Sequence, residues 1–525
     1  MTETYDVVIA GAGHNGLMTA AYLAKAGVNV CVVEHQAYVG GGVITRELTL
    51  PGFKHDLCST WHAFIFPNPV IKDDELDLQA KFGLKYIVPS AYTGVVFDDE
   101  TGLVFYRDLD KTCESIAKIS EHDAQAYRKF HDVAIRTLDV LAAGMYSPPP
   151  PFSAQFALLE QSDEGRELLR AMMISALDVV DEVFESDKLK IALSRYASEA
   201  MINPAVKGTG MVLFLFVPLI HKYGGGIPVG GSGELSESLV RCIKHHGGTI
   251  RLSSTVKSFK IAGGECSGLV LESGEEILAR KAVVTNFNIK QLPDMIGEDN
   301  LPQNFSRRVE NLAFSNFVPL NQHIALNEEP KYKLGGDMNE VFWVEYSHST
   351  MEGYLKAFYD LDFGYPRADL SINIVATKFD KTRAPEGKHT LYLYAFEPFE
   401  LKDGGAAKWD EIGQEVADSI LEQTRKMTTN MGDENILGRN IFTPLDYARH
   451  NPSYINGDFA HIGQFLWQQG ASRPMLGWGD YRLPVKKLYL CGPSAHPGVG
   501  VSGGGRGTVQ VIMEDLGIDF EKVIS

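Results

Sequence analysis

The chain has 525 residues, of which 44% are hydrophobic and 22% charged, and its formal net charge is −18. This length predicts two or three domains. The acidic balance excludes the basic surface that nucleic-acid binding requires, so we expect no nucleic-acid partner. It also argues against electrostatic docking on anionic lipid, whereas a weak, local apolar contact with a membrane stays open.

The six cysteines are scattered, with no CxxC pair and no His–Cys ligand spacing. They predict a reducing compartment without disulfides, structural zinc or another metal site. The chain begins with the acidic stretch MTETYD rather than a secretory signal, so we expect a cytoplasmic protein. The longest apolar run, MVLFLFVPLI at 211–220, is too short to span a bilayer. It is expected to line a substrate channel, to dip into a membrane or to belong to the core.

The stretch VVIAGAGHNGLMTAAYLAKAGVNVCVVE, residues 7–34, changes pattern several times. Residues 7–10 are a short apolar run, typical of a buried parallel strand. Residues 17–26 have the periodicity of a helix, and 28–33 predict a second strand. The stretch therefore predicts a strand–helix–strand unit.

Gly11, Gly13 and Gly16 form a GxGxxG motif between the first strand and the helix. The first glycine permits a tight turn, the second lets the backbone approach a pyrophosphate, and the third lets the helix pack closely on the strand. Glu34 ends the second strand and can accept hydrogen bonds from ribose hydroxyls. The unit predicts a dinucleotide site, which this motif alone does not assign to NAD or FAD.

A second glycine run, Gly40 to Gly42, follows six residues after the acid. It resembles the second fingerprint of the amine-oxidase and phytoene-desaturase flavoproteins, which reads roughly GGRxxT. The resemblance assigns Gly41 and Gly42 to the cofactor site and implies FAD. Gly42 stands where the family has arginine, so another donor, with Arg46 as the candidate, would have to steady the pyrophosphate.

Two further segments resemble the same family. In the segment 225–261, a glycine turn leads into a predicted helix and then into a strand at 250–256. By resemblance, the backbone of Val256 would contact the adenine. The segment 268–288 predicts a hairpin and a strand that returns the chain to the nucleotide domain.

The C-terminal stretch LYLCGPSAHPGVGVSGGGRGTVQVIMEDL resembles the flavin motif of phytoene-desaturase-like proteins. A predicted strand ends at Gly492, and a loop containing His496 follows. Gly503 and Gly504 then lead into a helix predicted at 508–516. The N-terminus of that helix would face the anionic end of a reduced flavin.

The chain is most similar in these motifs to the branch with phytoene desaturases, carotenoid isomerases and pyridine-nucleotide-disulfide-oxidoreductase-domain proteins. The resemblance implies an α/β fold, a Rossmann-type domain with non-covalent FAD, and an interleaved α+β substrate domain that roofs the flavin. The FAD-binding domain would comprise 1–65, 224–290 and 455–525, and the substrate-binding domain 66–223 and 291–454.

Between the motifs, helices are predicted over 117–141 and 166–184, with a stiff polyproline link at 147–152. Residues 390–399 alternate like a strand above the flavin, and their aromatic side chains are expected in the core rather than in a ligand cage. These aromatics are Tyr392, Tyr394 and Phe396.

Three residues are the catalytic candidates. His62 follows the second glycine fingerprint, in a segment that runs toward the flavin ring in related folds, and Tyr481 and Arg473 precede the flavin loop. Arg473 could hold a substrate carboxylate. Asp56 is expected to be structural, and neither a metal motif such as HExxH nor a GxSxG elbow in its strand context is present in the sequence.

The function expected first is dehydrogenation of a carbon–carbon bond in an apolar, isoprenoid or alicyclic substrate, with hydride transfer to flavin N5. Oxygen, a quinone or another acceptor would reoxidise the flavin, because a second complete dinucleotide motif is not visible. The alternatives are a redox-neutral isomerase using reduced FAD, an amine oxidase with Trp467 or Trp478 at the flavin, and a non-catalytic FAD-binding escort. A homodimer is a base-rate expectation.

Overall fold

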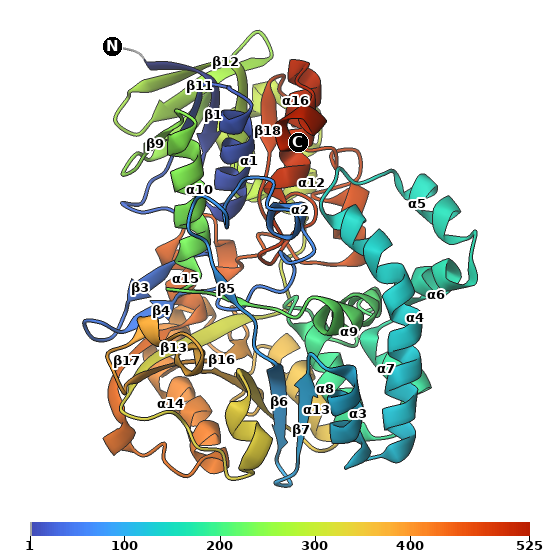
Figure 1. Ribbon diagram of the computed structural model, residues 1–525. Helices are drawn as coiled ribbons and strands as arrows, with labels where there is room; N and C mark the ends of the chain where they lie inside the picture. Colours follow the sequence, from blue (N-terminus) through green and yellow to red (C-terminus); the bar gives the residue numbers. More distant parts are fainter. Residues whose placement is uncertain (1–2) are drawn as a thin grey trace.

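The computed structural model describes residues 3–525, which form an upper and a lower part, each built around a seven-stranded sheet (Figure 1). The upper part starts with β1 (Glu3–Ala10), α1 (His14–Lys25) and β2 (Val30–Val33), as the glycine motif predicts. Helix α1 is buried nearly all round because α10 (Gly233–His245) and α16 (Gly505–Leu516) pack beside it. An Ala- and Leu-rich helix suits this position, since small side chains allow close packing.

The first sheet has the strand order β10-β11-β12-β1-β2-β9, and β18 pairs with β12. Strands β18, β12, β1, β2 and β9 run parallel, and β10 and β11 add antiparallel pairs. The remaining strands are β9 (Thr249–Arg251), β10 (Val256–Ala262), β11 (Glu265–Leu271), β12 (Glu276–Thr285) and β18 (Leu488–Leu490).

The two ends of the chain meet in this part of the molecule. Figure 1 shows α1, in blue, beside α16, in red. The Asn15 side-chain oxygen accepts a hydrogen bond from the Gly505 amide at 3.3 Å, across 490 positions of sequence. Asn68 donates to the Ser502 carbonyl oxygen at 2.8 Å. The C-terminal glycine motif is therefore attached directly to the N-terminal one.

The second sheet has the order β17-β13-β16-β15-β14-β6-β7 and is mostly antiparallel, with β14 and β6 parallel. Its helix α14 covers one face, whose core includes Trp409, Ile420 and Leu421. The strands are β6 (Ala91–Phe97), β7 (Gly102–Tyr106), β13 (Val318–Leu326), β14 (Trp343–Ser347), β15 (Ser371–Ile374), β16 (His389–Glu397) and β17 (Ile436–Phe442).

A group of helices between residues 109 and 222 shares a core with the other face of the second sheet. Figure 1 shows this teal and green group to the right of the lower sheet. These helices are α3 (Leu109–Ala117), α4 (Glu121–Met145), α5 (Phe152–Leu159), α6 (Asp163–Ala171), α7 (Ala176–Val183), α8 (Asp187–Ser198) and α9 (Met211–Lys222).

The remaining elements are short pieces and the covering helices of both parts. Two small antiparallel pairs join β3 to β4 and β5 to β8. The elements are β3 (Thr45–Glu47), β4 (Lys54–Asp56), α2 (Pro69–Lys72), β5 (Tyr86–Ile87), β8 (Ile227–Pro228), α11 (Leu292–Ile296), α12 (Phe305–Glu310), α13 (Met351–Asp362), α14 (Trp409–Met427), α15 (Pro444–His450) and α17 (Phe520–Ile524).

Two predicted helices are each divided by a capping serine. The helix expected over 117–141 begins at Glu121, because the Ser120 hydroxyl accepts a hydrogen bond from the Asp123 amide and starts a new helix there. The helix expected over 166–184 is split in the same way at Ser175, which forms a reciprocal capping box with Asp178. Hydrophobic periodicity does not reveal either break.

Two short segments of the predicted substrate-binding domain pack against the nucleotide-binding sheet instead. Val70, Leu76 and Leu84 share the core of the first sheet, as do Leu292 and Phe305. The sequence motifs place these stretches, around 69–84 and 289–309, in the substrate-binding domain. Their packing against the nucleotide-binding sheet comes from apolar side chains in segments that carry no nucleotide motif.

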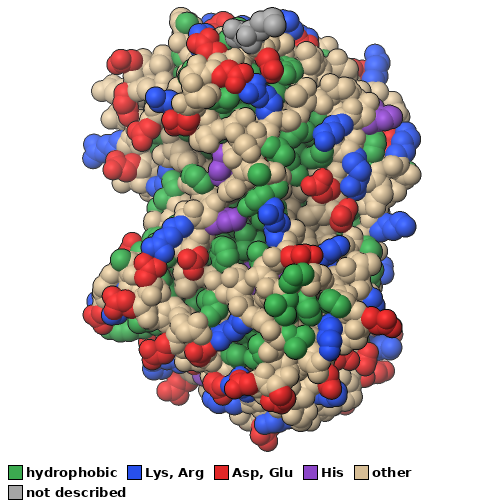
Figure 2. Space-filling view, turned by 90° about the vertical axis from the view of Figure 1, so that its left-hand side faces the viewer, with side chains coloured by type: hydrophobic (Ala, Val, Ile, Leu, Met, Phe, Trp, Pro, Cys, Tyr) green, Lys and Arg blue, Asp and Glu red, His purple; other side chains and the backbone are tan. Residues whose placement is uncertain are grey.

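The apolar run 211–220 forms most of helix α9, with Pro218 inside it. Leu213, Val217 and Leu219 belong to the helical core. No helix within residues 3–525 combines the length and apolarity needed to cross a bilayer. Figure 2 shows acidic and basic side chains interspersed over the face turned to the viewer, rather than one field of negative charge.

A buried ion pair joins the second glycine fingerprint to the lower sheet. The Arg383 guanidinium donates to Asp56 Oδ2 at 2.6 Å, and Asp56 Oδ1 accepts from Thr45 Oγ1 at 2.6 Å and the Ser232 amide at 2.8 Å. Arg383 also pairs with Asp380. Asp56 therefore has a structural position that ties four segments together.

We expect Asp56→Asn to lower the free energy of unfolding by about 3 kcal/mol, because it removes one charge of a buried pair and leaves Arg383 poorly compensated. Urea denaturation measures the change. The control is Asp410→Asn, which breaks an exposed pair with Arg449 and should cost less than about 1 kcal/mol. Equal losses in the two variants would contradict this account of Asp56.

Candidate functional site

A cavity of about 820 Å³ begins at the GxGxxG loop and continues into the lower part of the molecule. Its lining comes from segments across the whole chain, from Gly11 to Val501. One end is built from glycines and polar side chains and the other from aromatic side chains. The size lies within the range of small-molecule and cofactor sites.

The glycines at the polar end let the backbone come very close to other groups. A Cβ atom on Gly13 would lie 2.5 Å from Nδ2 of Asn286, and one on Gly41 would lie 3.1 Å from the Cα of Gly13. Gly41 also has a φ of +60°, which side chains disfavour. Gly11, Gly13, Gly41 and Gly42 all line the cavity, so the two glycine runs form one surface.

Glu34 lies at the end of β2 and lines the same end of the cavity. Its Oε2 accepts a hydrogen bond from the Ala12 amide at 2.7 Å, and its Oε1 accepts one from the Gln36 amide at 2.9 Å. Burial alone would raise the pKa of this carboxyl, but hydrogen bonds from His35, Gln36 and Ala12 outweigh burial and lower it. Glu34 is therefore held ionised, as an acceptor of ribose hydroxyls must be.

Seven cavity-lining side chains carry a buried polar atom without a hydrogen-bond partner among residues 3–525, and three of these atoms adjoin the glycine motifs. These three are Nε2 of His14, Oδ1 of Asn286 and Nε2 of Gln464. Buried polar groups are normally paired, so these atoms indicate where a polar ligand would bind. Burial lowers the pKa of His14 to about 4, which keeps this ring neutral. The glycine surface, Glu34 and these free polar atoms together fit a flavin dinucleotide.

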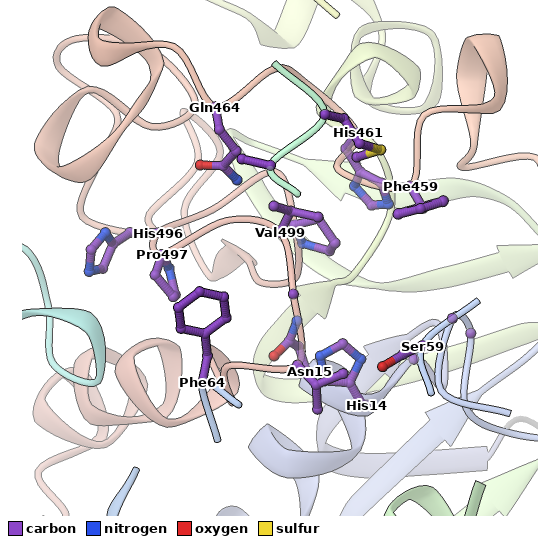
Figure 3. A pocket seen from close by; sticks show the side chains of 18 of the residues that line it. His14, Asn15, Ser59, Phe64, Phe459, His461, Gln464, His496, Pro497 and Val499 are labelled. Atoms are coloured by element: carbon purple, nitrogen blue, oxygen red, sulfur yellow. The ribbon is translucent and has the colours of Figure 1, made fainter. Parts of the chain in front are cut away.

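The segments that contribute to this region surround one space (Figure 3). His14 and Asn15 come from α1, and Ser59 and Phe64 follow the second glycine run. The other labelled side chains come from the last seventy residues: Phe459, His461, Gln464, His496, Pro497 and Val499.

The predicted cofactor residues divide into two groups. Gly11, Gly13, Glu34, Gly41, Gly42, Val256 and His496 line the cavity. The others lie behind this lining and support it: Gly16, Gly492, Gly503 and Gly504. For example, a Cβ on Gly16 would lie 2.5 Å from the Gly11 carbonyl oxygen, and one on Gly504 would lie 2.8 Å from Cδ of Pro497.

The residue expected to replace the missing arginine lies elsewhere. Arg46 is exposed and stacks over the ring of Tyr38 at 4.2 Å, and Tyr38 rather than Arg46 lines the cavity. At Gly42, a Cβ would lie 2.9 Å from the Tyr454 hydroxyl. The space of a side chain at position 42 is thus filled by Tyr454, a cavity residue that no sequence motif indicated.

The three residues expected to take part in catalysis do not line the cavity. His62 is buried and its Nδ1 bonds the Tyr86 hydroxyl at 2.9 Å. Arg473 is buried and donates to main-chain carbonyl oxygens, including those of Ala460 and Gln468, so it has no free edge for a substrate carboxylate. Tyr481 is buried and donates to the His496 carbonyl oxygen at 3.3 Å. These contacts give each residue a structural position.

The apolar end of the cavity is an aromatic chamber. The rings of Trp61 and Trp343 lie 5.6 Å apart and perpendicular, and those of Tyr392 and Tyr394 lie 5.5 Å apart. Met211, Val212, Leu215 and Phe216 line it from one face of α9, so the apolar run 211–220 contributes both to the cavity and to the core. The aromatic lining comprises Trp61, Phe64, Tyr196, Phe216, Trp343, Tyr392, Tyr394 and Phe396.

The chamber also includes Tyr392, Tyr394 and Phe396, which lie in the core as expected. It also differs from the alternative site in which Trp467 or Trp478 would flank a substrate. Trp467 is largely exposed and stacks on Phe465, and Trp478 packs against Phe305 in the upper core. Neither lines the cavity.

A charged cluster lies at the wall of the aromatic chamber. Arg195 is buried, and its Nη1 lies 2.7 Å from Oε1 of Glu199, which lines the cavity. The Tyr394 hydroxyl donates to Glu199 Oε2 at 2.8 Å. Behind this pair, Glu345 accepts a hydrogen bond from Trp343 Nε1 at 3.0 Å. Burial raises the pKa of Glu345 to about 7, Arg195 opposes the rise and Glu199 adds to it.

Comparison with known proteins agrees with this geometry. A family model described as an NAD(P)-binding Rossmann-like domain matches residues 9–73. Pyridine nucleotide-disulfide oxidoreductase domain-containing protein 2 of Rattus norvegicus is 29% identical, covering 98% of this chain and 94% of its own length. A limonene dehydrogenase chain of Castellaniella defragrans is 25% identical, with coverage of 98% and 95%. Phytoene desaturase (lycopene-forming) of Pantoea ananas is 23% identical, with coverage of 97% and 99%.

The chain is an FAD-dependent oxidoreductase, similar over nearly its whole length to phytoene desaturases and their relatives. A solved putrescine oxidase, a double mutant redesigned in its cofactor binding, has the same fold with a TM-score of 0.64, at 14% identity and with coverage of 98% of this chain and 100% of that one. FAD, when bound, supplies an acceptor for hydride.

Replacing Gly13 by valine is expected to weaken FAD binding by about 10- to 100-fold, since overpacking costs roughly 1–3 kcal/mol and Gly13 has no room for a side chain. The visible flavin spectrum of the purified protein and an FAD titration measure the change. Gly27→Asn is the control, because Gly27 has a positive φ that asparagine tolerates and open space around it. Wild-type FAD content in Gly13→Val would contradict the assignment.

Glu345 makes the stability of this oxidoreductase depend on pH. Its folded pKa, about 7, lies above its ordinary value, so the folded state holds the proton more tightly than the unfolded state does. The protonated carboxyl therefore contributes to the free energy of unfolding, and this contribution is lost as pH rises through about 7. We expect the melting temperature of the wild type to fall more steeply from about pH 5 to about pH 7 than that of Glu345→Gln. Exposed Glu415→Gln should keep the wild-type slope. Parallel slopes in all three proteins would refute the assignment.

Proposed function

We propose that this oxidoreductase dehydrogenates a carbon–carbon single bond of an apolar alicyclic or isoprenoid substrate. The observation that carries the proposal is the continuity of the cavity, which runs from the nucleotide-binding glycines into a chamber of aromatic side chains. A substrate in the chamber would therefore lie in the same space as the reactive part of the flavin. The flavin supplies the oxidant, and the protein must bind the substrate and receive its proton.

The chamber favours an uncharged substrate. The charges at its wall, on Glu199 and Arg195, already pair with each other. A substrate ammonium or carboxylate would have to compete with that pair or be buried without compensation, which is costly. Aromatic and aliphatic side chains, such as Trp61, Phe216 and Leu215, instead suit a hydrocarbon surface.

The relative from Castellaniella defragrans supports the same class of substrate, because its name joins dehydrogenation to limonene, an alicyclic hydrocarbon. For the acceptor, we propose oxygen, a quinone or another external oxidant. The full strand–glycine–helix–strand–acid pattern occurs once in the sequence, around Gly11 to Glu34, and is used for FAD.

The test is an anaerobic titration of the FAD-loaded protein with limonene, a cyclic ketone and putrescine, followed by product analysis. We expect limonene-type substrates to bleach the flavin and to appear as products with two hydrogens fewer. Bleaching by putrescine alone would make the protein an amine oxidase. Isomerisation that requires prior reduction of the flavin would make it an isomerase, and no bleaching by any compound would leave an escort protein.

A pair of variants tests the chamber itself. Leu215→Trp narrows the chamber and should slow bleaching by limonene about tenfold or more while FAD remains bound. Leu437→Trp adds the same bulk at a partly exposed position on β17 and should have no effect. Unchanged bleaching in Leu215→Trp would place the substrate elsewhere.

A further inference from the structure

One carboxyl group of the aromatic chamber has no part in holding FAD. Within residues 3–525, the carboxyl side chains that line the cavity are Glu34, at the nucleotide end, and Glu199, in the chamber. Glu199 follows the last residue of α8, and Arg195 lies one turn earlier on the same helix. An ionisable group in an apolar pocket is costly to bury, so its position calls for a chemical reason.

Resting on the dehydrogenation proposed above, we propose that Glu199 is the general base that receives the proton released by the substrate. In that reaction the substrate loses two hydrogens. One leaves with both electrons of its C–H bond to the oxidised isoalloxazine. The other leaves as a proton to a Glu199 carboxylate oxygen, and the electron pair of its C–H bond becomes the second bond between the two carbons.

The geometry leaves Glu199 able to do this. Its Oε2 accepts one hydrogen bond, from Tyr394, while its Oε1 is 2.7 Å from Arg195 without an aligned hydrogen bond within the described chain. Because Oε1 is buried, the acceptor position that remains for a substrate is the second lone pair of Oε2, beside its bond from Tyr394. Arg195 stabilises the charge, and Tyr394 holds the orientation of the carboxylate.

Two tyrosines connect Glu199 to the cofactor end of the cavity. Tyr394 lies beside Tyr392, and the Tyr392 hydroxyl donates to the Cys58 carbonyl oxygen at 2.6 Å. Cys58 belongs to the segment that carries Ser59 and Trp61 along the cavity wall. The base therefore lies at the wall of the chamber next to the segment that follows the second glycine fingerprint.

The surroundings of Glu199 raise its proton affinity above that of an ordinary carboxyl group. Burial raises the pKa of the carboxyl, and the Arg195 charge and the Tyr394 hydrogen bond oppose this rise. A general base works best with a pKa near the operating pH. The other titratable groups facing this cluster, from α8, α13, β14 and β16, are Tyr196, Tyr354, Glu345 and Tyr392.

The experiment compares Glu199→Gln with Glu345→Gln, because both remove a carboxyl that interacts with Arg195 and only Glu199 lines the cavity. Anaerobic flavin reduction by limonene is followed as a function of pH. In the wild type the rate should rise with pH as Glu199 loses its proton. Glu199→Gln should reduce the rate about a hundredfold or more and abolish the rise, whereas Glu345→Gln should retain it.

A second readout needs no turnover. Infrared spectra of the FAD-loaded protein without substrate, recorded from acidic to mildly alkaline pH, should contain a carboxylic-acid band that disappears as pH rises. Glu345, whose pKa is about 7, gives such a band as well, so the Glu199 band is the one that is missing in Glu199→Gln and kept in Glu345→Gln. Glu199→Asp should keep both the band and part of the rate, which a purely structural role would not explain. FAD content and melting temperature show whether each variant is folded.

The outcomes separate the two proposals. If the wild type is bleached by limonene and Glu199→Gln is bleached equally fast with the same pH profile, Glu199 is not the base and the proposed function stands. If no hydrocarbon bleaches the wild type, the function fails and the role of Glu199 fails with it. Loss of the rate and of the infrared band in folded, FAD-loaded Glu199→Gln supports the proposal.

Discussion

The close approach of backbone segments around Asn286 is the constraint on which the cofactor site depends. This residue follows β12, and its amide lies between the first glycine loop and the C-terminal motif. A Cβ on Gly13 would lie 2.5 Å from the amide nitrogen, and one on Gly492 would lie 1.9 Å from the amide oxygen. Side chains at either glycine would push apart strands that must be adjacent for the dinucleotide surface to exist.

The cavity that results is divided by polarity, and this division explains its chemistry. Near the glycines, main-chain amides, Glu34 and unpaired polar atoms suit phosphates, ribose and a flavin ring. Beyond them, α8, α9 and the second sheet supply aromatic and aliphatic surface. The charged pair at that surface, Arg195 with Glu199, is internally compensated, so it can accept a proton without attracting charged ligands.

The predicted glycines lie together at the cavity, whereas the predicted catalytic residues lie outside its lining, for a physical reason. Glycine motifs act through backbone geometry, which neighbouring residues determine. Side-chain direction depends on details that a motif does not contain. Trp61 and Ala63 line the cavity, but His62, between them, bonds the Tyr86 hydroxyl instead. The same holds for Arg473, whose guanidinium satisfies buried carbonyl oxygens.

The sequence by itself determined the strand–helix–strand unit and its dinucleotide site, because the glycines and Glu34 are local requirements of a dinucleotide, and its resemblance to flavoproteins implied FAD. Only the tertiary structure decided which distant side chains share the chamber. Glu199 and Tyr394 are 195 positions apart and meet because α8 packs against the second sheet. Tyr454 fills the space left by Gly42 for the same kind of reason. Such contacts follow from the packing of whole elements, which periodicity and spacing along the chain do not encode.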